Sequence, residues 1–310
     1  MKTPFLKTPF SIILSTILVS LFGAIIFFLF GTIFYALFFD INLFSNIHFY
    51  LSGNYSEPSI VMFTKIGQIF QSIGMFVIPP IVIVYLSRTN VISSLSLNKN
   101  PNLLVLLLAG IVMIVGMPLI DVMSVFNSKM VFPEALGWLE DWMRQSEENV
   151  ARITKIFLDV SSVSGLMLNL FMVALIPAIG EELMFRGFIQ KFIAKRLNIH
   201  IAIFISAFIF SAIHMQFFGF LPRLVMGMFF GYLLYWSGSL WLPMFAHFVN
   251  NAAAVIITYK MGVENMSSES IVDDKTNYLY IVISSLFITA SLVYIIYWFS
   301  TNKETRKEIN

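Results

Sequence analysis

Residues 166–186 read LMLNLFMVALIPAIGEELMFR, in which two adjacent carboxylates and a guanidinium end an otherwise apolar run. The apolar part predicts a membrane helix, where each such charge costs about 2.5–3.5 kcal/mol on insertion scales. These groups normally face a bundle interior or a wet cavity, so intramembrane carboxylates are candidate functional residues. Glu182 and Arg186 share one helix face and can form an ion pair. Glu181 is turned about 100° away and is free for other chemistry.

The composition places the rest of the chain in a membrane as well. Of 310 residues, 58% are hydrophobic and 12% are charged, about half the charge of a soluble domain. The net charge is +2 and the basic residues are spread over loops, so we expect no nucleic-acid partner. Cysteine is absent, which excludes disulfides and cysteine nucleophiles. The sequence predicts an all-α polytopic membrane protein.

Candidate spans can be counted because a spanning helix needs about 20 apolar residues. Eight segments qualify, of which the fifth and sixth are short enough for a re-entrant arrangement: 11–39, 59–86, 103–120, 163–185, 201–215, 221–236, 241–259 and 278–299. Lysine and arginine gather in alternate connections and acidic residues in the others, which places both termini in the cytoplasm. We therefore predict about eight transmembrane helices around a polar intramembrane cavity.

Three local features modify this outline. Residues 133–160 predict an amphipathic helix at the outer interface, and a gating role for it has no sequence support. Pro177 should kink or break its helix one turn before the glutamates. Gly227 and Gly231 form a GxxxG face that predicts a close helix contact, and Arg223 is expected to extend toward the membrane surface.

Two of the four histidines, His214 and His247, lie in apolar spans. A lone intramembrane histidine is more often a helix–helix hydrogen-bonding residue, but two of them after a Glu-Glu-x-x-x-Arg helix favour a site. His247 and Asn251 are four apart and project from one helix face. If the chain turns near Asn198, Glu181 lies 17 residues before the turn and His214 lies 16 after it. Both then reach a similar depth in the membrane.

The sequence resembles the CPBP family of intramembrane proteases, which includes the CAAX prenyl endopeptidase and bacterial bacteriocin-processing and immunity proteins. The resemblance covers residues 160–259 and rests on three motifs in the family's order. These motifs are Glu181-Glu182-x-x-x-Arg186, Phe210-x-x-x-His214 and His247-x-x-x-Asn251. The segment Ser239-Leu-Trp-Leu-Pro-Met-Phe-Ala-His247 also looks like the family's approach to its last motif.

The resemblance implies hydrolysis of a peptide bond inside a membrane cavity that is open to the cytosol. In one version of the chemistry, Glu181 is general base to a water also held by His214, while His247 and Asn251 stabilise the oxyanion. In the other, Glu181, His214 and His247 bind Zn²⁺. We favour the version without a cofactor, and zinc stays the alternative. The expected catalytic residues are Glu181, Glu182, His214, His247 and Asn251, with Arg186 as the ion-pair partner of Glu182.

The expected protein is thus an intramembrane endopeptidase of the CAAX-protease-like type that acts on a membrane-associated or prenylated-type protein or peptide. The competing hypotheses are a non-proteolytic scaffold, an immunity protein and a proton-coupled transporter, although a transporter would favour repeated halves that this chain lacks. We expect one membrane domain with three parts: N-terminal helices with the outer segment (1–159), a CPBP-like core (160–259), and a last span with a cytoplasmic tail (260–310). We expect an integral multi-pass protein of the bacterial inner (plasma) membrane.

Overall fold

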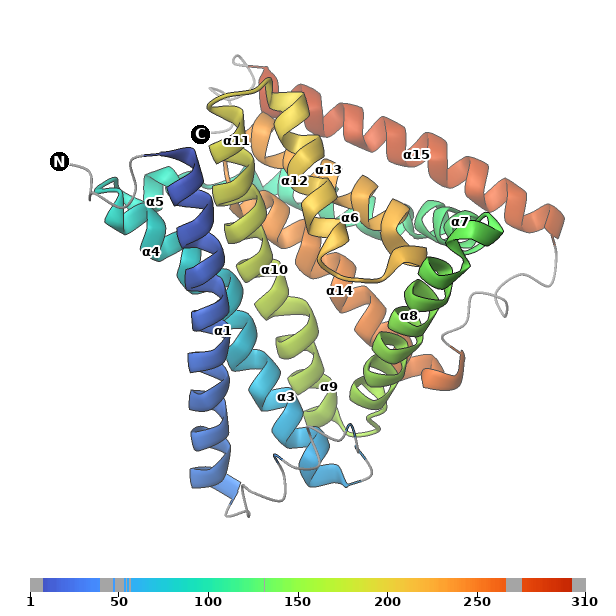
Figure 1. The fold of residues 1–310 in the computed structure, drawn as a ribbon. Helices are drawn as coiled ribbons and strands as arrows, with labels where there is room; N and C mark the ends of the chain where they lie inside the picture. The colour runs from blue at the N-terminus through green and yellow to red at the C-terminus, as the bar shows by residue number, and fades with distance from the viewer. Residues whose placement is uncertain are drawn as a thin grey trace.

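The chain folds as a bundle of helices, shown in Figure 1. This computed structural model describes residues 8–39, 57–130, 132–265 and 275–302, together with residues 47, 53 and 55. Within these residues there is no strand, so the all-α prediction is confirmed. The long helices are α1 (Pro9–Phe39), α3 (Pro58–Ser72), α6 (Leu103–Val115), α7 (Met117–Ser128), α8 (Gly137–Leu158), α12 (Ile199–Ala212), α13 (Phe220–Ser237), α14 (Trp241–Met261) and α15 (Lys275–Thr301).

Six helical stretches within the described residues are long and apolar enough to cross a membrane, and the number rises to seven if a bent pair counts as one span. The bent pair is α6 and α7, which meet at 44°. Helix α12 has 14 residues, which gives about 21 Å against a hydrocarbon core of about 30 Å. The chain is therefore an integral multi-pass membrane protein, but the predicted count of eight spans is not confirmed.

The third predicted span, 103–120, is wrong in its bounds because the helix stops at Val115. Gly116 separates α6 from α7, and Pro118 stands in the first turn of α7. Proline lacks the backbone N–H that would continue the helix and its ring clashes with the preceding turn. The chain therefore bends at this point instead of running straight across.

Two spans with a proline far from either end are continuous, so Pro177 does not break its helix. The segment Val163–Ala194 is one continuous span, made of α9 (Val163–Asn169), η4 (Leu170–Leu175), α10 (Ile176–Glu182), η5 (Leu183–Gln190) and α11 (Lys191–Ala194). The π-helical segment η4 directly precedes Pro177. The other span repeats the arrangement, with the π-helical η2 (Ile73–Val77) before Pro79 in α4 (Ile78–Leu86). A π-helical turn takes up the mismatch that a proline creates in the hydrogen-bond ladder.

Two glycines bring helix α1 close to the span that contains η2 and α4. A Cβ atom on Gly23 of α1 would overlap the backbone of Gly74 in η2, and the reverse is also true. Only a pair of glycines permits such an approach, as is typical of membrane helix contacts. Figure 1 shows α1 running along α3 and α4 at one side of the bundle.

The amphipathic segment is a helix, as predicted, but it is shorter than the predicted range. A 3₁₀ turn (η3, Glu134–Leu136) precedes α8, and α8 ends at Leu158. Its C-terminal end is anchored where Phe157 packs in one buried cluster with Ile69 of α3 and Met172 of η4. In Figure 1, α8 leans along the bundle beside α9. The helix is thus tied to the span that carries the glutamates.

Candidate active site

Glu182 lies at the centre of a buried ionic cluster. Its side chain has no exposed surface, and its Oε1 accepts from Arg186 Nη1 and from His247 Nδ1, both at 2.9 Å. The Arg186 bond joins two side chains one turn apart on the same helix, as the spacing predicts. The His247 bond joins α10 to α14 across 65 positions of sequence. One carboxylate therefore links the two motifs that are farthest apart.

Arg186 is held on every side. Its guanidinium is 1% exposed, and Nη2 donates to the carbonyl of Gly227 at 3.0 Å. The rings of Phe210 and Phe230 face its Cζ atom at 4.4 and 5.4 Å, which is within cation–π range. The guanidinium is thus neutralised, hydrogen-bonded and packed, and it has no free face for a substrate.

The predicted GxxxG contact is confirmed and has a further use. A Cβ atom on Gly227 would stand 3.0 Å from Ala207 of α12, and one on Gly231 would stand 2.8 Å from Ile203. Gln190 Nε2 donates to the Gly231 carbonyl at 3.2 Å, one turn beyond the bond from Arg186 to Gly227. The small residues of α13 therefore expose backbone carbonyls to the polar side chains of η5.

His247 is oriented by these contacts. It is 4% exposed and its ring stacks on Phe230, with centroids 5.1 Å apart and planes 18° apart. Because the carboxylate of Glu182 only accepts, Nδ1 of His247 is the donor. Nε2 then points the other way, and it lies 3.8 Å from Oε2 of Glu181. A buried histidine thus lies between the two glutamates.

Glu181 is the less constrained carboxylate. Its side chain is 12% exposed, and within the described residues it accepts no hydrogen bond. Its helix position turns it away from Arg186, and its one ion-pair contact among the described residues is with His247 at 3.8 Å. Glu181 is therefore the carboxylate that is available to a water or a substrate.

His214 lies just beyond the end of α12, in the connection to α13. Asn198 caps the start of α12 by accepting from the N–H of His200 at 2.9 Å, so the predicted turn is confirmed. The Nδ1 atom of His214 and the carbonyl of Phe210 are 2.7 Å apart, which makes Nδ1 the donor and leaves Nε2 with a lone pair. Phe210 makes edge-to-face contacts with both His214 and His247, at 4.9 and 6.0 Å between centroids. The Phe210 ring therefore contacts both histidines.

The connection that carries His214 is held from two sides. Met215 has a φ of +55°, an uncommon conformation for a residue other than glycine, which occurs at functional sites. Ser146 of α8 donates to the Met215 carbonyl at 2.9 Å. Arg223 Nη2 donates to Gln216 Oε1 at 2.8 Å. Arg223 thus contacts this connection just before the start of its own helix, and its extension toward the membrane surface stays a prediction.

Asn251 is tied to the same span as the glutamates. Its Nδ2 donates to the carbonyl of Val173 at 3.0 Å, and its Oδ1 accepts from Asn250 at 3.1 Å. Val173 lies in η4, where the helix is already irregular. One amide N–H of Asn251 stays outside these bonds, because the group carries two donors.

The structure therefore joins four predicted residues in one network and places two nearby. Glu181, Glu182, Arg186 and His247 are linked by the ion pairs above. In the described part of the chain no hydrogen bond joins His214 or Asn251 to either glutamate. His214 reaches the network through Phe210, and Asn251 through its shared helix with His247.

Zinc was the alternative for this site, with Glu181, His214 and His247 as ligands. Over the described residues, no group of three or more histidines and acidic residues is arranged to hold a metal ion. The residues present do not fit a metal in this arrangement, so we derive no step through one.

Sequence analysis missed two groups that shape the site. Phe210 was noted only for its spacing from His214, whereas its ring contacts Arg186 and both histidines. The α8 helix was interpreted as an interfacial helix, but Trp142 packs on Phe217 with centroids 5.2 Å apart. The apolar side of α8 indicated that this helix packs against another surface, but the sequence did not indicate which one.

Comparison with known proteins yields one match. Residues 163–253 fit the family model described as Rce1-like, type II CAAX prenyl endopeptidase Rce1-like. No curated protein and no solved structure matches the chain. The match supports endopeptidase activity of the CAAX-protease type in a membrane. The resemblance indicated by the motifs is confirmed, and the matched segment 163–253 holds every candidate site residue.

Proposed function

We propose that this protein is an intramembrane endopeptidase that hydrolyses a peptide bond of a membrane-associated or prenylated-type protein or peptide. The observation that carries the proposal is the placement of His247 between the two glutamates, of which Glu182 is bonded to Arg186 and His247 while Glu181 accepts no hydrogen bond within the described residues. A scaffold or an immunity protein has no need for an available intramembrane carboxylate. The Rce1-like match supports the same class of reaction.

In the proposed reaction, Glu181 removes a proton from a water whose oxygen attacks the scissile carbonyl carbon. His214 holds the same water, because its Nε2 has a lone pair that accepts the second hydrogen. Glu181 then gives its proton to the nitrogen of the departing amine as the C–N bond breaks. General acid–base catalysis by a positioned group of this kind contributes about 10²–10⁴-fold.

His247 and Asn251 stabilise the negative charge that develops on the carbonyl oxygen. His247 donates from Nε2 as an imidazolium, and Glu182 stabilises that ion through Nδ1. With His247 protonated, the two carboxylates balance the guanidinium and the imidazolium, so the buried cluster carries no net charge. Asn251 adds its second amide N–H. Glu182 and Arg186 act as positioning residues and do not touch the substrate.

The test is Glu181→Gln, assayed on purified full-length protein with a cleavable membrane peptide. The substitution keeps size and hydrogen bonding but removes the base, so we expect turnover to fall by about 10²-fold or more. The amount of folded protein and its melting temperature should stay near those of the wild type. Activity is therefore expressed per folded molecule.

Glu148→Gln is the matched control, because Glu148 is an exposed carboxylate on α8 and should leave turnover unchanged. If Glu181→Gln retains its specific activity while Glu182→Gln loses it, the roles of the two glutamates are reversed. If both retain it, the protein is not a glutamate-dependent hydrolase.

A further inference from the structure

Lys65 is a buried cation that the proposed reaction does not use. It is 4% exposed and lies seven residues after Pro58, which starts α3, so it is about 10 Å along the helix. Its Nζ donates to Asn169 Oδ1 at 2.9 Å, and Asn169 Nδ2 donates to the Phe157 carbonyl at 2.9 Å. An ammonium carries three N–H donors. Two of them remain outside these bonds.

Lys65 also lacks a counter-ion. Among the described residues, no carboxylate lies within salt-bridge distance of it. The amide of Asn169 supplies a dipole but no charge. A buried ammonium without an opposite charge is costly, and charges within membrane spans are normally paired or mark a binding site. The opposite charge is therefore expected to come from outside the described chain.

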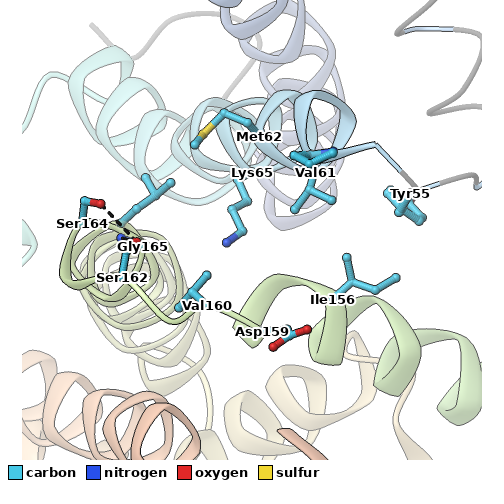
Figure 2. Close-up of a pocket in the computed structure, with 12 residues that line it drawn as sticks. Tyr55, Val61, Met62, Lys65, Ile156, Asp159, Val160, Ser162, Ser164 and Gly165 are labelled. Carbon is cyan, nitrogen blue, oxygen red and sulfur yellow. Dashed lines mark hydrogen bonds between the residues drawn. The ribbon is translucent and has the colours of Figure 1, made fainter. Parts of the chain in front are cut away.

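A cavity of about 550 Å³ opens directly beside this lysine. It lies between the start of α3, the end of α8 and the start of α9, and Figure 2 shows the Lys65 side chain pointing into it. Its volume is typical of small-molecule sites. Most of its wall is apolar, formed by residues such as Val61, Met62, Ile156 and Leu168. Ser162 and Ser164 add hydroxyl groups on the α9 side.

We propose that this cavity binds the singly charged acid group of an amphiphile, with Lys65 as its counter-ion. One ammonium with two spare donors matches one carboxylate or one phosphodiester. Asp159 is exposed at the same cavity, and its charge disfavours a ligand with two negative charges. The apolar walls accept the ligand's hydrocarbon part. The opening lies where two spans begin, the level at which acid groups of membrane amphiphiles lie.

The site is separate from the proposed active site. Asn169 precedes Glu181 by 12 residues on one continuous span, which is about 18 Å. The binding proposal therefore does not depend on peptide hydrolysis, and it can be tested on the protein whether or not a substrate is known.

The test measures melting of the purified full chain with defined amphiphiles. In detergent, oleate is compared with methyl oleate, which has the same chain without the charge. In nanodiscs, phosphatidylcholine alone is compared with phosphatidylcholine plus phosphatidylglycerol. We expect oleate, phosphatidylglycerol or both to raise the melting temperature above that of the neutral probe. A shift with oleate alone identifies a carboxylate, and one with phosphatidylglycerol alone identifies a lipid phosphodiester.

Lys65→Met should remove this shift and weaken retention of the acid probe in native mass spectrometry by about tenfold or more. Without a ligand, this variant should melt at the same temperature as the wild type or higher, because it no longer buries an unpaired charge. Lys155→Met is the control, since Lys155 is exposed on α8. An equal shift with the neutral probes in the wild type overturns the proposal, and so does an unchanged shift in Lys65→Met. The comparison of probes on the wild type needs no variant to fold.

Discussion

The cluster of Glu182, Arg186 and His247 and the side chain of Lys65 all place ionic groups at 4% exposure or less within the spans. Glu182 accepts from two cationic or polar partners, and Arg186 has a carboxylate, a carbonyl and two rings around it. Lys65 has a single amide oxygen. The first group is complete as an ion pair, because Glu182 and Arg186 carry opposite charges in contact, whereas no carboxylate among the described residues lies within salt-bridge distance of Lys65.

This difference separates structural from functional charge. A buried ion pair stabilises the fold only while both partners stay in place, since removing one leaves the other uncompensated. A buried charge without its partner has to be compensated by something that binds. Glu181 resembles Lys65 in its unused hydrogen-bonding capacity, because it accepts no hydrogen bond within the described residues, although His247 lies 3.8 Å away. Both residues are where we propose that a molecule from outside is held.

The largest expected effect follows from breaking the complete cluster. Glu182→Gln or Arg186→Met should lower the free energy of unfolding by about 3–5 kcal/mol, the usual cost of removing one partner of a buried pair. Lys65→Met should lower it by little or raise it. The measurement is denaturant unfolding of each purified variant in the same detergent, together with the amount of folded protein per cell.

The double variant Glu182→Gln with Arg186→Met supplies the control. Because it leaves no uncompensated guanidinium, its loss of stability should be smaller than the sum of the two single losses. Equal losses in Lys65→Met and Arg186→Met would show that the two kinds of buried charge do not differ as described.

The sequence could predict ion pairs within one helix but not the contacts between helices. The Glu182–Arg186 pair follows from helix geometry alone, and so does the separation of Glu181 from it. The bond from Glu182 to His247 depends on how α10 packs against α14, and no spacing encodes it. Lys65 and Asn169 are likewise 104 positions apart. Polar residues in apolar spans could thus be singled out, but their partners could not be assigned.

Helix ends were predictable where a residue acts on its own turn and not where packing decides. The turn expected near Asn198 is confirmed, and the side chain of Asn198 caps the helix that follows it. Pro177 was expected to kink or break its helix, and a π-helical turn directly before it keeps that helix continuous.

A smaller effect is expected from crowding the complete cluster without removing a charge. A Cβ atom on Gly227 would lie 3.1 Å from Arg186 Nη2 and 3.0 Å from Ala207. Gly227→Ala should therefore push the guanidinium away from the carbonyl that it bonds, at a cost of about 1–3 kcal/mol for an overpacked core. Denaturant unfolding measures the loss. Gly137→Ala is the control, because nothing stands within 4 Å of a Cβ atom there, and equal losses in the two variants would contradict the crowding.

The smallest effect concerns Glu147, a carboxylate on α8 whose pairing is intermediate between the two extremes. It accepts from the Phe218 N–H at 3.3 Å, beside the connection that carries His214. Burial raises the pKa of Glu147 above its ordinary value of 4.5, while the Phe218 bond and the charge of Arg223 oppose the rise. The folded state thus holds this proton more tightly than the unfolded chain. Its contribution to stability is complete below pH 4.5 and is lost as the pH rises through the raised pKa.

Glu147→Gln should therefore flatten the decline in stability above pH 4.5, with little change at lower pH, where the wild-type carboxyl is already neutral. Glu140 provides a control of opposite sign. The Phe132 N–H, followed by Arg144, lowers the pKa of Glu140, so its contribution is lost as the pH falls and Glu140→Gln should flatten the acidic limb instead. Melting temperature measured across the pH range distinguishes the two limbs. If Glu147→Gln instead changed stability at acidic pH, the folded protein would favour the ionised form of Glu147. That result would contradict the incomplete pairing described for this carboxylate.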